Sequence, residues 1–174
     1  RQMCIRDREE AKRILIQRLR QEGELDRTRM HLPFIPKHIA IVTGTGSAAL
    51  SDMQRLIDNR WPGLRRTVIG VLVQGDRAVE EIVRAMALTR QLSHPEVAAK
   101  RGEPPVDLVI VGRGGGSPQD LWAFNMEPVV RAVLASPVPV VSAVGHESDL
   151  LVSDLVADVR ASTPSNAIER SVPI

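Results

Sequence analysis

The sequence predicts an α/β protein built on an open, doubly wound, mostly parallel four-stranded sheet of the Rossmann-like or flavodoxin-like type, with helices on both faces and an N-terminal helix before it. Two observations predict this fold. Short apolar runs without polar alternation, typical of strands buried on both faces, recur along the chain. Longer segments follow them in which apolar residues recur at helical spacing. Because strand and helix alternate with short connections, we expect right-handed crossovers and the strand order 2-1-3-4.

The elements can be placed in order along the chain. Gly23 is positioned to end the first helix, and Trp61, Pro62 and Gly63 to end the second. Asp76 can cap the third helix, and a polar loop is expected over 93–105. The strands are expected at 38–43, 67–73, 107–111 and 138–144, and the helices at 9–20, 47–59, 76–92, 119–135 and 148–159.

The domain organisation predicted from the sequence has three parts. Residues 1–8, RQMCIRDR, fit neither the helix that follows nor a targeting signal, and they resemble the translation of a sequencing adapter, so we set them aside as an artefact. Residues 9–36 form a helix and a linker, and residues 37–174 form one domain. We find no apolar run long enough to span a membrane, and the single cysteine, Cys4, favours a reducing compartment. We therefore expect a soluble cytoplasmic domain.

Composition alone says little about partners. The net charge is only +2, which neither requires nor excludes nucleic acid. The chain has two Trp, two Phe and no Tyr, which argues against an array of aromatic side chains for stacking bases.

The loops that follow the first, third and fourth strands carry the chemistry. In a doubly wound sheet, ligands bind outside the carboxyl ends of the strands, near the point where the strand order reverses. The first of these loops contains Gly44, Gly46 and Ser47 and leads to Asp52 in the next helix. Glycines and a helix N-terminus suit a phosphate, and the spacing also fits the G-x-G-x-x-A dinucleotide pattern. A tight turn that binds nothing is the alternative, and no acidic residue closes the second strand as a dinucleotide site requires.

The second loop, residues 112–117, is more specific. Arg113 precedes Gly114, Gly115, Gly116 and Ser117. Three consecutive glycines are costly to order, so ordinary connections rarely carry them. Backbone N–H groups beside a guanidinium and a helix N-terminus describe an anion-binding cradle. A flexible surface loop is the alternative.

The third loop offers an acid–base pair. His146 and Asp149 are three residues apart at a predicted helix start, so the carboxylate can orient the imidazole. A structural or capping histidine is the alternative. Asp154 and Asp158 are expected to be surface or salt-bridge groups on the helix that follows, and the other histidines, His31, His38 and His94, receive no role. These residues predict an α/β enzyme that handles phosphate.

Long segments of the chain resemble a known family. VGRGGGSPQDLWAFNMEPVVRAVLASPVPVVSAVGHESD, at 111–149, is similar to the central signature of the exonuclease VII large subunit. SDLVADVRASTPSNAIE, LVQGDRAVEEIVRA and LPFIPKHIAIVTG are similar to further segments of that family. The resemblance covers about residues 9–174.

The resemblance implies hydrolysis of single-stranded DNA from either end in the bacterial cytoplasm. It also implies a partner, several copies of a small subunit, which dock through a C-terminal coiled-coil region absent here. An oligonucleotide-binding domain precedes this region in complete large subunits. The family is described as active without added divalent metal, so no metal site is expected, although Mg²⁺ is possible as a stimulator. The alternative is a nucleotide-binding α/β module without nuclease activity.

The family's functional positions fall on Asp52, Arg113, His146 and Asp149, and all four residue types are present. The neighbouring positions expected to contact phosphate or DNA are Gly44, Gly46, Ser47, Gly114, Gly115, Gly116 and Ser117. One departure is the first loop, which usually reads Thr-Ser-Pro-Thr-Gly in the family and reads TGTGS here, at 43–47.

Overall fold

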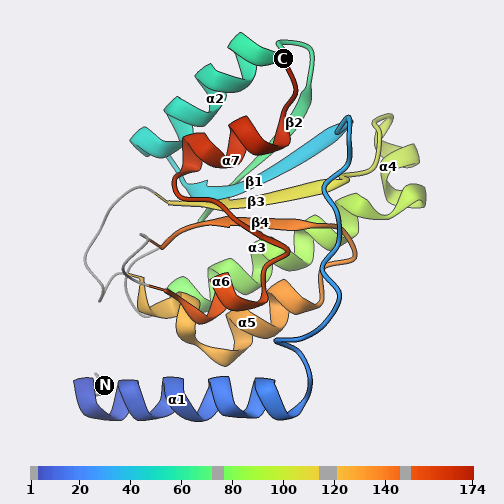
Figure 1. Ribbon diagram of the computed structural model, residues 1–174. Helices are drawn as coiled ribbons and strands as arrows, with labels where there is room; N and C mark the ends of the chain where they lie inside the picture. The colour runs from blue at the N-terminus through green and yellow to red at the C-terminus, as the bar shows by residue number, and fades with distance from the viewer. Residues whose placement is uncertain (1–3, 72–76, 114–120, 146–149) are drawn as a thin grey trace.

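A five-stranded parallel sheet lies at the centre of the molecule (Figure 1). The computed structural model describes residues 4–71, 77–113, 121–145 and 150–174. The strand order β2-β1-β3-β4-β5 confirms the predicted order 2-1-3-4 and adds a short edge strand. The strands are β1 His38–Gly44, β2 Arg65–Val71, β3 Leu108–Gly112, β4 Val140–Ala143 and β5 Val159–Arg160.

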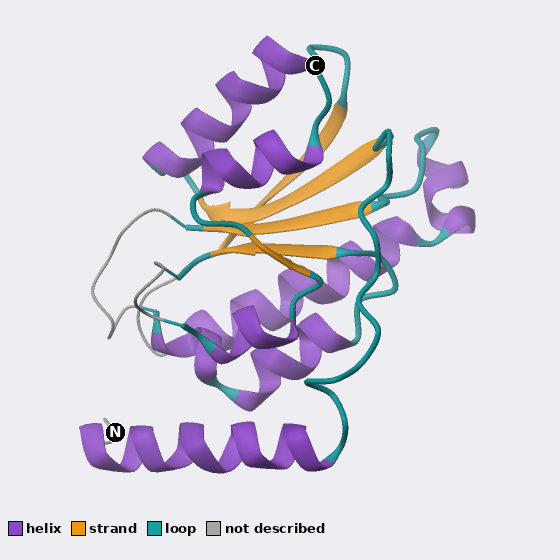
Figure 2. Ribbon diagram, viewed as in Figure 1, coloured by secondary structure: helices purple, strands orange, loops and turns teal. Residues whose placement is uncertain are grey.

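Helices cover both faces of the sheet, which confirms the doubly wound arrangement (Figure 2). The helices α2 and α7 lie on one face, whereas α3, α5 and α6 lie on the other, and α1 packs outside that second layer (Figure 1). The helical segments are α1 Ile5–Gln21, α2 Ala48–Arg60, α3 Ala78–Ser93, α4 Pro95–Arg101, η1 Trp122–Asn125, α5 Glu127–Leu134, α6 Val152–Val156 and α7 Pro164–Ser171.

The core has two halves because alternate residues of a strand face opposite sides of the sheet. Ile39 and Ile41 of β1 belong to the cluster packed under α2 and α7, whereas Ala40 and Val42 belong to the cluster under α3 and α5. All four are at most 1% exposed. Burial on both faces explains why this strand reads as a continuous apolar run.

The segment predicted as a loop at 93–105 contains the helix α4, so that prediction was wrong. His94 Nδ1 accepts the N–H of Glu96 at 3.2 Å, and Pro95 occupies the start of the helix. Gly102, at φ +69°, ends it in the left-handed conformation. A capping side chain, an N-terminal proline and a C-terminal glycine are the ordinary signals of a helix, and the sequence carries all three.

The predicted helix at 148–159 was also too long. Within the described residues, α6 spans only Val152–Val156, and the chain then extends into β5. Asp158 fixes this change, because its Oδ2 accepts the N–H of Val140 at 2.9 Å and its Oδ1 that of Met30 at the same distance. A strand of two residues is too short for any periodicity to reveal it.

The helix predicted at 119–135 is divided. The structure describes η1, then Met126 in an extended conformation, then α5. Pro128 lies at the start of α5 and has no N–H to donate to the preceding turn, so one continuous helix is disfavoured there.

The first helix begins earlier than predicted. It starts at Ile5, with Cys4 Sγ accepting the N–H of Asp7, so the expectation that residues 5–8 lie outside it was wrong. Gly23, at φ +80°, follows its end as predicted. In α3 the capping position belongs to Arg77, whose side chain makes no capping hydrogen bond, and Asp76 lies outside the described residues.

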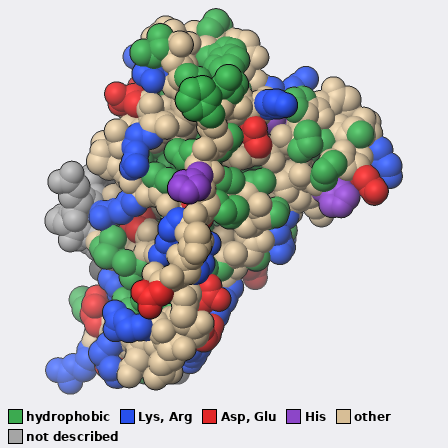
Figure 3. All heavy atoms as spheres, turned by 45° about the vertical axis from the view of Figure 1, so that its right-hand side comes forward, with side chains coloured by type: hydrophobic (Ala, Val, Ile, Leu, Met, Phe, Trp, Pro, Cys, Tyr) green, Lys and Arg blue, Asp and Glu red, His purple; other side chains and the backbone are tan. Residues whose placement is uncertain are grey.

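Among the residues that the structure describes, no helix is long and apolar enough to cross a membrane. Figure 3, which turns the amino-terminal ends of the strands toward the viewer, shows acidic and basic side chains interspersed over this face. This distribution agrees with the small net charge of +2.

Candidate functional site

The carboxyl ends of β1, β3 and β4 lie side by side. Val42 pairs with Val111, and Gly112 pairs with Ala143. The N–H of Arg113 donates to the carbonyl of Ala143 at 3.2 Å, so the pairing continues one residue past the end of β3. The chain leaves β1 toward β2 on one side and β3 toward β4 on the other, so the strand order reverses between β1 and β3. The predicted site loops therefore start where open α/β sheets bind ligands.

The first loop is a capped tight turn. The N–H of Ser47 donates to the carbonyl of Gly44 at 3.3 Å, and Gly46 between them has φ +71°. Ser47 Oγ accepts the N–H of Leu50 at 3.1 Å and so caps α2. The hydroxyl hydrogen of Ser47 is not used by this cap and can donate to a bound group. This geometry is compatible with both interpretations, a tight turn that binds nothing and a loop that contacts phosphate.

Two glycines allow the chain to pack closely at this edge. A side chain at Gly70 of β2 would collide with the hydroxyl of Thr45, so glycine lets the first loop fold over the end of β2. A Cβ at Gly112 would lie 3.3 Å from Met53 Cε and 3.7 Å from Pro164 Cβ. Gly112 therefore lets α2 and the start of α7 close over the end of β3.

Asp52 lies in the second turn of α2, on the solvent side. Its side chain is 52% exposed, and its Oδ1 accepts a hydrogen bond from Arg55 Nη2 at 2.7 Å, three residues along the helix. An exposed pair of this kind adds little to stability. The carboxylate is thus accessible to solvent at this end of the helix.

Arg113 is partly buried directly after β3. The other predicted residues of the second and third loops, Gly114, Gly115, Gly116, Ser117, His146 and Asp149, lie outside the described residues. What the structure does define is the chain on both sides of the third loop, from β4 to Gly145 and from Leu150 to α6.

Asp154 joins the two sides of the third loop, which the sequence analysis did not foresee. Its Oδ1 accepts the hydroxyl of Ser142 at 2.7 Å, and its Oδ2 accepts the N–H of Leu151 at 3.0 Å. The Nε atom of Arg160 lies 4.0 Å from Oδ2, and the Asp154 side chain is fully buried. Its predicted surface position was therefore wrong, whereas the alternative of a salt-bridge group is confirmed by Arg160. Its position among the apolar residues of α6 was the available signal, because a charge there must be paired to be buried.

Asp158 is likewise buried, with a side chain only 1% exposed, so its predicted surface position was wrong and its predicted salt bridge is confirmed. Arg27 Nη1 lies 3.5 Å from its Oδ1. Arg29 donates to the carbonyls of Leu155 and Val156 at 2.8 Å and 3.0 Å. The segment between α1 and β1 is thereby fastened to the end of α6.

The sequence matches the protein family described as "Exonuclease VII, large subunit" over residues 25–174. The chain belongs to this family. A protein of Alkaliphilus oremlandii named exodeoxyribonuclease 7 large subunit is 47% identical over 157 residues, which are 90% of this chain and 36% of the relative. Proteins of the same name from Hahella chejuensis and Chlorobaculum tepidum are 44% and 46% identical, over 90% and 91% of this chain. The chain spans about a third of the length of these relatives, 33% to 38%.

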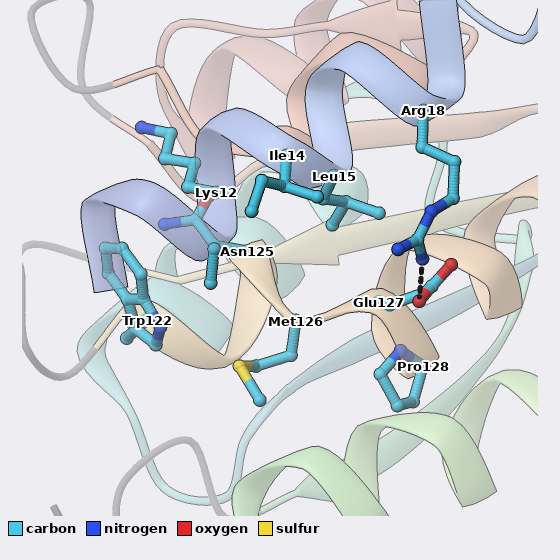
Figure 4. A pocket seen from close by; sticks show the side chains of 10 residues that line it. Lys12, Ile14, Leu15, Arg18, Trp122, Asn125, Met126, Glu127 and Pro128 are labelled. Atoms are coloured by element: carbon cyan, nitrogen blue, oxygen red, sulfur yellow. Dashed lines mark hydrogen bonds and ion pairs between the residues drawn. The ribbon is translucent and has the colours of Figure 1, made fainter. Parts of the chain in front are cut away.

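A pocket of about 330 Å³ in this exonuclease VII large-subunit chain lies between α1 and the η1–α5 segment (Figure 4). Lys12, Ile14 and Arg18 face it from α1, and Trp122 and Met126 from the other side. None of the predicted site residues lines it. Arg18 Nη1 lies 2.9 Å from Glu127 Oε1, so the pocket lies along the contact between α1 and the η1–α5 segment.

An arginine and two glutamates also link α1 to α5. Arg131 donates to Glu22 at 2.6 Å and 2.9 Å and to Glu127 at 3.0 Å and 3.2 Å. These hydrogen bonds hold the pKa values of both carboxyls below their usual range and raise the pKa of the Arg131 guanidinium. Because all three groups are largely solvated, their contribution to stability is small.

Among the described residues, no group of three or more His, Cys, Asp and Glu side chains lies close enough to hold a metal ion. His38, a buried histidine, has a structural role. Its Nδ1 lies 2.8 Å from the carbonyl of Pro104, to which it must donate, and its Nε2 is hydrogen-bonded to the hydroxyl of Thr67 at 2.7 Å. It lies at the start of β1, at the edge of the sheet opposite the site.

Proposed function

We propose that the whole protein hydrolyses the phosphodiester bonds of single-stranded DNA from either end, as the catalytic large subunit of exonuclease VII. The observation that carries the proposal is the alignment of the ends of β1, β3 and β4 in a chain of this family. The loops leading to Asp52, Arg113 and His146 leave these three strand ends. The relatives named exodeoxyribonuclease 7 large subunit support the reaction class.

Phosphate binding is assigned to the first two loops. Arg113 and the N–H groups of Gly114, Gly115 and Gly116 would hold the scissile phosphate, with Ser117 beside them. A guanidinium is permanently charged and can make two parallel hydrogen bonds to phosphate oxygens. The turn at Gly44, Gly46 and Ser47 would contact a neighbouring phosphate through the start of α2.

Proton transfer is assigned to the third loop. His146, oriented by Asp149, would activate the attacking water or protonate the leaving oxygen. Asp52 would complete the acid–base pair. Its exposed carboxylate in the second turn of α2 is compatible with that role. Phosphodiester hydrolysis also requires the charge on the phosphorus to be neutralised, which is the task given to Arg113.

The proposal extends to cofactor and partner. The reaction would not require a metal, and Mg²⁺ would act at most as a stimulator. Several copies of the small subunit would bind to the C-terminal coiled-coil region that the family resemblance implies. The complex would work in the cytoplasm. No comparison supports the alternative of a nucleotide-binding module without nuclease activity.

The test uses the complete large subunit, co-expressed with its small subunit. End-labelled single-stranded and double-stranded oligonucleotides are incubated with the complex in excess EDTA, then with Mg²⁺. We expect loss of the single strand only, abolished by His146→Ala and strongly reduced by Arg113→Ala at saturating DNA. His94→Ala is the matched control, because His94 caps α4 on a different part of the molecule and should leave turnover unchanged.

The outcomes distinguish the metal-independent nuclease from its alternatives. Cleavage in EDTA supports the metal-independent assignment. Cleavage only after Mg²⁺ is added keeps the nuclease but makes Asp52, His146 and Asp149 candidate metal ligands. No cleavage under either condition refutes the proposed activity, and unchanged turnover in Arg113→Ala refutes the role given to that residue.

A further inference from the structure

We propose that Asp154 is a positioning residue, which holds together the two ends of the chain segment that carries His146 and Asp149. Its carboxylate accepts the hydroxyl of Ser142 at 2.7 Å on one oxygen and the N–H of Leu151 at 3.0 Å on the other. Ser142 lies before that segment and Leu151 directly after it. The inference rests on the proposed function of this segment.

A carboxylate suits this bridge because its two oxygens accept in different directions. The Asp154 side chain is fully buried. Arg160, a residue of β5, places its Nε 4.0 Å from Asp154 Oδ2. Hydrogen bonds to a buried charged group are stronger than neutral ones, and losing them is costly. The bridge therefore fixes the position of Leu151 relative to Ser142.

The bridge also relates the third loop to the second. Ser142 pairs with Val111 in the sheet, and the next residue, Ala143, accepts the N–H of Arg113 at 3.2 Å. A displacement of Leu151 away from Ser142 would thus move the end of the third loop relative to Arg113. Under the proposed function, the distance between the proton-transfer pair and the phosphate-binding guanidinium depends on Asp154.

Asp158 provides a matched control. It is also a buried carboxylate after β4, and it also accepts two backbone N–H groups, those of Val140 and Met30, at 2.9 Å. Its contacts, however, lie at the start of β4 and on the segment before β1, not at the third loop. Loss of Asp158 should cost stability without moving that loop.

The experiment compares Asp154→Ala, Asp154→Asn and Asp158→Ala in the complete large subunit with its small subunit. In Asp154→Ala, kcat on saturating single-stranded oligonucleotide should fall by about 10²-fold, as misplaced catalytic groups do, with KM nearly unchanged. Asp154→Asn should keep most of kcat, because its amide oxygen can accept from Leu151 and its NH₂ can donate to Ser142 Oγ. Asp158→Ala should lower the melting temperature as Asp154→Ala does but keep kcat.

A second measurement does not depend on activity. Hydrogen exchange of the Leu151 amide should quicken by about tenfold or more in Asp154→Ala and stay unchanged in Asp158→Ala. If Asp154→Ala is too unstable to purify, Ser142→Ala removes one arm of the bridge and should lower kcat in the same direction.

Three results overturn the proposal: wild-type kcat in folded Asp154→Ala, an equal loss of kcat in Asp158→Ala, or the same loss in Asp154→Asn as in Asp154→Ala. An inactive wild-type complex whose Leu151 exchange still responds to Asp154 would instead refute the proposed function and leave the bridge intact.

Discussion

Thr43→Val should stabilise the protein, although it removes a polar group from β1, an inner strand of the sheet. Thr43 is 1% exposed in β1, and its hydroxyl has no hydrogen-bond partner among the described residues. Burying a hydroxyl without a partner costs about 1–3 kcal/mol in proteins. Valine has nearly the same shape and favours strands. We therefore expect the free energy of unfolding to rise by about 1–2 kcal/mol.

The matched control is Thr89→Val in α3. Thr89 is fully buried like Thr43, but its hydroxyl donates to the carbonyl of Met86 at 2.7 Å. Removing that hydrogen bond should lower the free energy of unfolding by about 1 kcal/mol. The same substitution should thus have opposite signs at the two sites.

Urea titration followed by circular dichroism measures both variants. A change in midpoint at constant slope reports stability, and each kcal/mol corresponds to about 2–4 °C in melting temperature for a chain of this size. If Thr43→Val loses as much stability as Thr89→Val, the Thr43 hydroxyl is hydrogen-bonded and the reasoning is refuted.

Three further predictions concern the turn, the docking of α1 and the buried histidine. Gly46→Ala should cost about 1–2 kcal/mol of unfolding free energy because φ is +71°, whereas Gly63→Ala, without positive φ, should cost less; equal urea midpoints for the two variants would show that alanine is not strained at position 46. Arg131→Gln should weaken the docking of α1 and shift the fluorescence of Trp122, and acid should do the same in the wild type. In the folded protein, the pKa values of Glu22 and Glu127 are lowered. Their contribution to the docking of α1 is therefore present above the pKa of the unfolded state and is lost as the pH falls through the pKa of the folded state; a pH-independent spectrum would contradict this. His38→Ala should cost about 2–4 kcal/mol, measured by thermal unfolding, and a smaller loss than at Gly46 would show that its two hydrogen bonds matter little.

The sheet could be predicted from the sequence because its strands are buried on both faces. Ile39, Ala40, Ile41 and Val42 form an unbroken apolar run whose only stable place is the middle of such a sheet. The short strand β5 could not be predicted, because its two residues are fixed by the distant contacts of Asp158 rather than by a local pattern.

The candidate site was only partly predictable. The turn and the helix cap at Gly46 and Ser47 depend on local chemistry, so the sequence indicates them. Gly46 adopts a positive φ and Ser47 caps α2. Asp154 was missed because its role comes from Ser142, twelve residues earlier on another element. Its place among the apolar residues of α6 indicates burial, but nothing local shows which distant group pairs with it.

The two edges of the sheet differ in a way that bears on how the protein opens. At the amino edge, His38 is fully buried with both ring nitrogens bonded, and Asp107 accepts the N–H groups of Lys37 and His38. At the carboxyl edge, Gly44 and Gly46 have no side chains to pack in the first turn, and the Thr43 hydroxyl has no partner among the described residues. We expect native-state amide exchange to be governed by global unfolding at the first edge and by smaller local openings at the second. Stabilising substitutions at the amino edge should then slow exchange by global unfolding and leave the local openings at the carboxyl ends of β1 and β3 unchanged.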